Sequence, residues 1–95
     1  MIVGILTMEI MVPSSRSLKE KRSVVKRFKD RLSHQFRVSV AEVGDAKEAW
    51  DRANIAVVAV SDDGSVVSAI MNRVVSFTEK QRNMELANYE TRFVG

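Results

Sequence analysis

The sequence predicts an α/β fold (an α+β sandwich) made of a single domain, residues 1–95, in which a four-stranded antiparallel sheet carries two helices on one face. Three observations lead to this prediction. Four segments show the alternating or continuous apolar pattern of strands, two segments show apolar residues at helical spacing, and the order is strand, helix, strand, strand, helix, strand. A chain of 95 residues can bury one modest core without disulfides.

The first strand is expected from Ile2 to Val12. One side of it is wholly apolar and includes Leu6, Met8 and Ile10, because successive side chains of a strand point to opposite faces. Pro13 ends the strand, since proline has no N–H to donate to a neighbouring strand.

The first helix is expected from about Leu18 to Ser33. Ser17 with Glu20 three residues later forms a capping box, which marks a helix start. At 100° per residue, one sector of about 120° is apolar and must face the sheet. This sector contains Leu18, Val24, Val25, Phe28 and Leu32.

The remaining elements follow from the same patterns. Strands are expected at Phe36–Val43, Ile55–Val60 and Met84–Val94, and a second helix, capped by the residues "SDDGS", at about Val66–Gln81. The segment "AKEAWDRA" is expected to form a helical turn. Two split βαβ crossovers of the right hand then give the ferredoxin-like βαββαβ fold.

Composition excludes several classes of function. The chain has no cysteine, which removes thiolate catalysis and cysteine-ligated metals, and no spacing of acidic residues and histidine predicts a catalytic, cofactor or metal site. The apolar opening carries Glu9, lacks a basic region and a cleavage site, and is too short to span a bilayer. We therefore expect a cytoplasmic protein that is not an enzyme, with no cofactor, no small-molecule substrate and no contact with membranes.

Positive charge is concentrated in one stretch. From Arg16 to Arg37 there are nine Lys or Arg residues against two acidic ones, whereas the remainder has six against ten. Such an uneven distribution favours the approach of a polyanion to one face.

Part of this charge forms a row on the first helix, the basic stripe, composed of Lys19, Arg22, Lys26 and Lys29. Helical geometry places the row on a flank beside the apolar sector, over a length of about 15 Å. Neighbouring like charges repel one another, and a phosphate backbone would reverse the sign of that energy. The alternative is an ordinary solvated helix face. Lys21, close to the apolar sector, is expected to direct its ammonium outward to water.

Four other features have structural explanations beside functional ones. The loop "PSSRS" could bind phosphate at the helix start, although serine there more often acts as a cap. His34 is expected to end the first helix rather than to act as a ligand. Asp62 and Asp63 are expected to cap the second helix rather than to bind a cation, and Trp50 to cover one edge of the core.

The two central strands lack the aromatic residues on which sheet-based RNA-binding domains stack bases, since "VGILTMEI" and "IAVVAV" contain none. The helix-free side of the sheet is instead apolar, with Val3, Ile5 and alternate residues of Ile55–Val60. A homodimer would bury this side most simply, and another protein partner would serve equally.

The segments "SLKEKRSVVKRFKDRL" and "FRVSVAEVGDAKEAWDRANIAVVAVSDD" closely resemble the DUF503 family of short bacterial proteins, also called YlxP-like. The likeness extends over essentially the whole chain. It implies a ferredoxin-like fold with no known active site, and a gene that in many bacteria lies among genes for translation initiation and ribosome assembly. Members often have Asn where this chain has Arg37, which adds charge here.

Two functions of different class remain. The first is a non-catalytic binding module that contacts structured RNA, such as ribosomal RNA, through the phosphates. The residues expected to make these contacts are Arg16, Lys19, Arg22, Lys26 and Lys29. The second is a protein-interaction or structural factor, working through the apolar sheet face or the Trp50 loop, with no role for nucleic acid.

Overall fold

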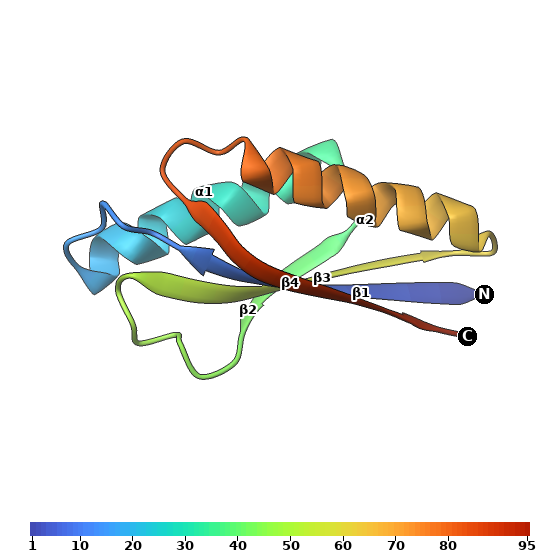
Figure 1. Ribbon diagram of the computed structural model, residues 1–95, viewed down its shortest axis with the longest axis horizontal. Helices are drawn as coiled ribbons and strands as arrows, with labels where there is room; N and C mark the ends of the chain where they lie inside the picture. The colour runs from blue at the N-terminus through green and yellow to red at the C-terminus, as the bar shows by residue number, and fades with distance from the viewer.

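The computed structural model describes all 95 residues and confirms the ferredoxin-like arrangement (Figure 1). Its sheet has the strand order β2-β3-β1-β4, with every neighbouring pair antiparallel, and both helices lie on one side of it. The elements are β1 Ile2–Met11, α1 Leu18–Gln35, β2 Ser39–Val43, β3 Arg52–Ser61, α2 Gly64–Glu79 and β4 Glu85–Val94.

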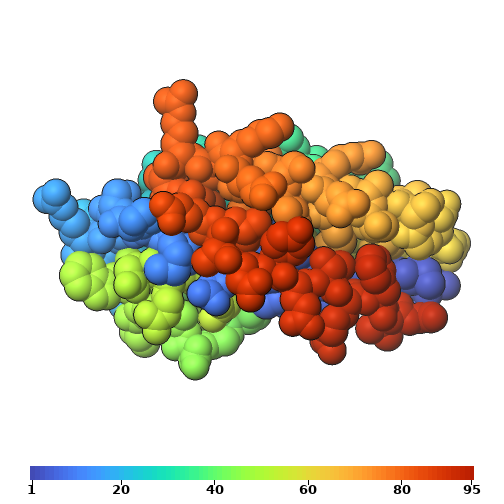
Figure 2. Space-filling view, in the orientation of Figure 1, coloured from blue at the N-terminus to red at the C-terminus, as the bar shows by residue number.

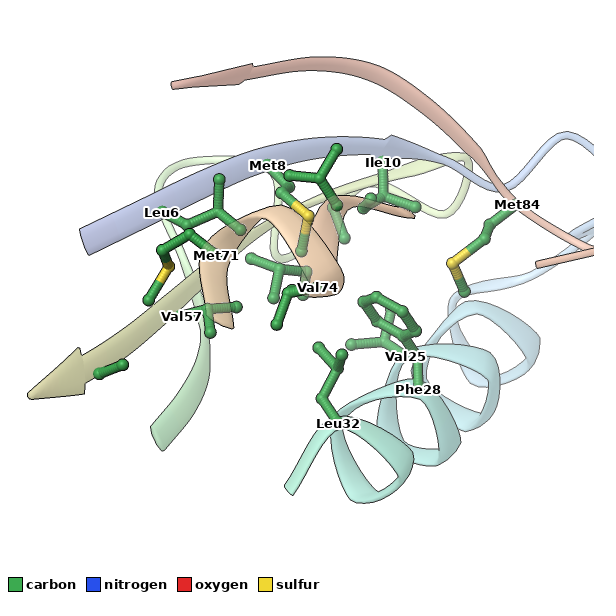
Figure 3. Packing of buried hydrophobic residues seen from close by; sticks show 14 of the residues in the cluster. Leu6, Met8, Ile10, Val25, Phe28, Leu32, Val57, Met71, Val74 and Met84 are labelled. Atoms are coloured by element: carbon green, nitrogen blue, oxygen red, sulfur yellow. The ribbon is translucent and has the colours of Figure 1, made fainter. Parts of the chain in front are cut away.

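The core lies between the sheet and the two helices, as the alternation in the first strand predicts (Figure 3). Leu6 and Met8 of β1 are fully buried on the helix side, and Phe28 and Leu32 of α1 point toward them from below in the figure. Burying one such side chain contributes about 2 kcal/mol to folding. The apolar sector of α1 thus decides which of its flanks remain in solvent.

Gly4 allows α2 to approach β1 closely. A Cβ atom at this position would lie 2.4 Å from Cγ1 of Val67, a stiff side chain in the core. The absence of a side chain at Gly4 therefore sets how near α2 can sit to the sheet.

Some element boundaries differ from those expected. The strand expected to begin at Phe36 begins at Ser39, because Phe36 still belongs to the end of α1. Its backbone N–H donates a hydrogen bond to the Leu32 carbonyl, and its ring packs edge-on against the ring of Phe77, with 5.7 Å between the ring centroids. The "AKEAWDRA" segment forms a single turn, closed by the hydrogen bond from Ala49 to Ala46, after which β3 begins at Arg52.

The connection between β2 and β3, residues 44–51, lies against the start of α1. Figure 2 shows the two segments, yellow-green and blue, in contact at one end of the molecule. Gly44 begins the connection with φ +79, a left-handed conformation that glycine adopts without strain. The connection contacts α1 through Lys21 and Arg22.

Candidate nucleic-acid interface

The start of α1 is closed by its own side chains. Ser17 Oγ accepts a hydrogen bond from the Glu20 N–H at 3.1 Å, and a Glu20 carboxylate oxygen accepts one from the Arg16 N–H at 2.7 Å. The predicted cap is confirmed, although Glu20 reaches one residue further back than a capping box requires. Because the carboxylate occupies this end of the helix, we do not place a phosphate at the "PSSRS" backbone.

The basic stripe lies outside the core and largely in solvent. Lys19, Arg22 and Lys26 are exposed, Lys29 is half-buried, and Arg16 is exposed just before the helix. The buried sector, which includes Phe28 and Leu32, lies beside this stripe around the helix axis, as the helical spacing predicts.

Two stripe residues have acidic partners. Arg22 Nη2 lies 3.7 Å from Glu48 Oε1 of the β2–β3 connection, and Lys26 Nζ lies 3.1 Å from Asp30 Oδ2. The side chains of all four residues are more than half exposed, and such pairs contribute only about 0–1 kcal/mol. A phosphate could therefore replace either carboxylate at small cost.

The prediction that the ammonium group of Lys21 reaches solvent is wrong. The residue is 0% exposed, and its Nζ lies 2.9 Å from Glu42 Oε2. It also donates to the backbone carbonyls of Ala46, Lys47 and Arg52 at 3.2, 3.1 and 3.4 Å. Four acceptors surround three N–H donors, so the buried charge is paired and hydrogen-bonded.

We call the four acceptors around the Lys21 ammonium the Lys21 cage, namely the Glu42 carboxylate and the carbonyls of Ala46, Lys47 and Arg52. Through this cage α1 holds the β2–β3 connection. Two of its three carbonyls belong to that connection, and the third, of Arg52, begins β3. By holding the connection, Lys21 keeps Glu48 within reach of Arg22. Trp50, in the same connection, is 51% exposed and stands outside the hydrophobic cluster, so the prediction that it covers the core is wrong.

A second group of cations was not apparent from the sequence. Arg27 and Arg31 of α1 line a groove of about 350 Å³ together with Lys80 and Arg82, which follow α2. We call this the basic groove. The guanidinium of Arg31 donates to the Gln81 side chain at 3.0 Å. Figure 2 shows side chains from this end of α2, in orange, projecting from the upper surface.

No carboxylate is among the nine residues that line the basic groove, and none of its four cations takes part in an ion pair. Arg27 and Arg31 alone look like ordinary helix-surface residues in the sequence. Their neighbours Lys80 and Arg82 lie about fifty positions away along the chain. The only sequence signal is a basic pair, "KQR", directly after a helix.

Of the two aspartates expected to cap α2, only Asp63 does so. Asp63 caps α2 by accepting a hydrogen bond from the Ser65 N–H, and the hydrogen bonds from the Ser65 hydroxyl and N–H lower the pKa of its carboxyl group. Asp62 does not cap the helix but is exposed, with its Oδ1 3.9 Å from the N-terminal ammonium group of Met1. His34 lies in the last turn of α1. No cluster of three or more His, Asp or Glu residues is arranged to hold a metal ion, and no helix is long and apolar enough to cross a membrane.

The helix-free side of the sheet is apolar at one end, as predicted. Val3 of β1 stands between Val60 of β3 and Val94 of β4, and Val60 and Val94 are both more than half exposed. The next row along the same face contains Ile5 and Val58. Further along, the rows become polar, with Glu9 and Asn88 among their residues.

Comparison with known proteins identifies relatives of unknown activity. The family model described as "Protein of unknown function (DUF503)" matches residues 3–91. The chain is also 31% identical, over 84 residues, to the uncharacterized protein YlxP of Bacillus subtilis (strain 168). That alignment covers 88% of this chain and 90% of the relative.

Proposed function

The chain belongs to the DUF503 family, and from its own residues we propose that it is a non-catalytic binding module that contacts the phosphates of structured RNA through α1 and Arg16, two residues before it. The partner that we propose is ribosomal RNA in the cytoplasm. Structured RNA presents dense phosphates, and a protein can recognise it by shape and charge without stacking bases.

The observation that carries the proposal is the charge of α1. The helix has seven Lys or Arg residues against Glu20 and Asp30, and only Lys21 is buried in an internal ion pair. The other six cations surround the solvent-facing part of the helix. Cations at spacings of three and four residues repel one another, and this unfavourable energy becomes favourable when a polyanion binds.

A salt titration tests this proposal. Four phosphate contacts by the basic stripe alone should make the logarithm of affinity for a structured RNA fragment fall with the logarithm of salt concentration at a slope of roughly 3 to 4. The affinity should depend little on RNA sequence, because phosphates carry no sequence information. Failure of the wild-type protein to bind at low salt would contradict an RNA function.

A second candidate function follows from the helix-free face of the sheet. Val58, Val60 and Val94 expose apolar surface there beside Val3 and Ile5. Contiguous exposed apolar surface of this kind marks interaction sites. The alternative that we propose is a protein-interaction or structural factor that pairs with a second copy through this face.

Sedimentation equilibrium tests the pairing. We expect a homodimer at micromolar concentration, and replacement of Val58 and Val60 by Lys should give a monomer, because two charges would be buried without partners. Both residues point away from the core, so the melting temperature of the monomer should change little. A strict monomer of the wild type up to about 100 μM, a concentration well above the micromolar scale, would exclude the dimer.

A further inference from the structure

The helix α1 presents cations on two flanks. At 100° per residue, the centre of the basic stripe and the midpoint between Arg27 and Arg31 are separated by roughly 140° around the helix axis. The buried sector of Phe28 and Leu32 lies between them on one side, and solvent lies between them on the other. A ligand resting on the solvent side of α1 therefore meets positive charge to its left and to its right.

The basic groove differs from the stripe in having no acidic partner. Arg22 and Lys26 of the stripe have Glu48 and Asp30 within 4 Å, whereas the four groove cations form no ion pair. In the free protein none of these four cations has a carboxylate within 4 Å of its charged group. An anion in the groove would supply the missing negative charge and gain charge-assisted hydrogen bonds from up to three guanidinium groups.

The lining of the groove suits phosphate rather than a base. Phe28 is the one aromatic residue there, and with 2% exposure it offers no surface on which a base could stack. Around the cations lie the side-chain amides of Gln81 and Asn83, which can donate further hydrogen bonds. The groove is thus equipped to contact a backbone, without reading sequence.

We infer that the basic groove is a second phosphate-binding surface and that α1 lies along the minor groove of duplex RNA, with the stripe facing one backbone strand and the basic groove facing the other. This inference rests on the proposed RNA function. The minor groove of A-form RNA is wide and shallow and is bordered by two rows of phosphates. A helix about 10–12 Å across with cations on both flanks is suited to that shape.

Two variants with equal loss of charge test the inference. The groove variant carries Arg27→Gln, Arg31→Gln, Lys80→Gln and Arg82→Gln. The control carries Arg37→Gln, Lys47→Gln, Arg73→Gln and Arg92→Gln, four exposed cations outside the stripe and the groove that form no ion pair. Both are measured against an RNA hairpin of about 16 base pairs and against an unstructured strand of equal length.

We expect the groove variant to bind the hairpin about 10-fold to 100-fold more weakly than the control at 0.1 M salt, with a salt slope smaller by roughly 2 to 4. Its affinity for the single strand should fall much less, because a flexible strand does not hold two rows of phosphates at a fixed separation and loses conformational entropy if it bends to contact both flanks. Equal hairpin affinities for the two variants, or equal losses on hairpin and strand, would overturn the inference while leaving the RNA function in place. If the wild type binds neither RNA, the proposed function itself fails.

Melting curves establish that the variants are folded. The groove side chains are exposed, and the change breaks only the surface hydrogen bond from Arg31 to Gln81. If the fourfold variant unfolds, a double variant with Arg27→Gln and Arg31→Gln replaces it. Its salt slope should decrease by about half as much as expected for the fourfold variant, since the two residues supply half of the groove cations.

Discussion

Replacing Lys21 by Met is expected to lower the free energy of unfolding by about 3 kcal/mol. Met fills a similar volume but donates no hydrogen bond. The carboxylate of Glu42, 17% exposed, would lose its cation, and the carbonyls in the cage would lose their donor. Urea unfolding followed by circular dichroism measures the loss.

The same variant should release the β2–β3 connection. Trp50 is the single tryptophan and lies within that connection, so its fluorescence reports the change directly. We expect a shifted emission maximum and faster proteolysis between residues 44 and 51 under native conditions. Lys26→Met is the matched control, because Lys26 is on the same helix and its side chain is 76% exposed with one weak partner.

A double-mutant cycle separates the ion pair from the carbonyl contacts. Glu42→Gln in the wild-type background removes the negative charge that balances the buried ammonium, and it should cost more there than in the Lys21→Met background. Strictly additive losses would show that the 2.9 Å contact contributes no coupling energy. A Lys21→Met protein as stable as the Lys26→Met control would show that the cage is dispensable.

Lys21 and its neighbours on α1 show which structural features can be predicted from the sequence and which cannot. Local patterns predict the element order, the Ser17 cap and the buried sector of α1, because these depend on residues within a few positions of one another. Spacing places Lys21 near that sector, and the long stem favours an ammonium in water. The structure buries it because Glu42 and three carbonyls, 21 to 31 positions away in the chain, converge on one point.

The candidate interface likewise contains residues that the sequence predicts and residues that only the fold brings together. The stripe could be predicted because its members share one helix, although their exposure says nothing about a ligand. The acidic partner Glu48 and the groove partners Lys80 and Arg82 could not, since only the packed fold brings them to α1. Periodicity predicts which side of an element faces the core, but it does not predict which distant loop lies beside a solvent-facing flank.

Removing the charge of the basic stripe, by changing its four residues to Gln, should weaken binding to a structured RNA by about 100-fold to 1,000-fold at 0.1 M salt. Each lost phosphate contact should lower the salt slope by roughly 0.7 to 0.9. Arg22 and Lys26 contribute less than Lys19, because they must first leave Glu48 and Asp30. Filter binding over a salt series measures both quantities.

We choose Gln rather than Glu for these substitutions. Glu would place new carboxylates beside Glu48 and Asp30, so a lower affinity could come from repulsion within the protein as well as from lost RNA contacts. Gln keeps a long side chain of good helix propensity, and the exposed ion pairs it removes are weak, so melting should change little. The control is the variant with four Gln residues at positions 37, 47, 73 and 92, which loses the same net charge. If both variants bind equally well, total charge rather than the stripe sets the affinity, and the open sheet face becomes the better candidate for the working surface.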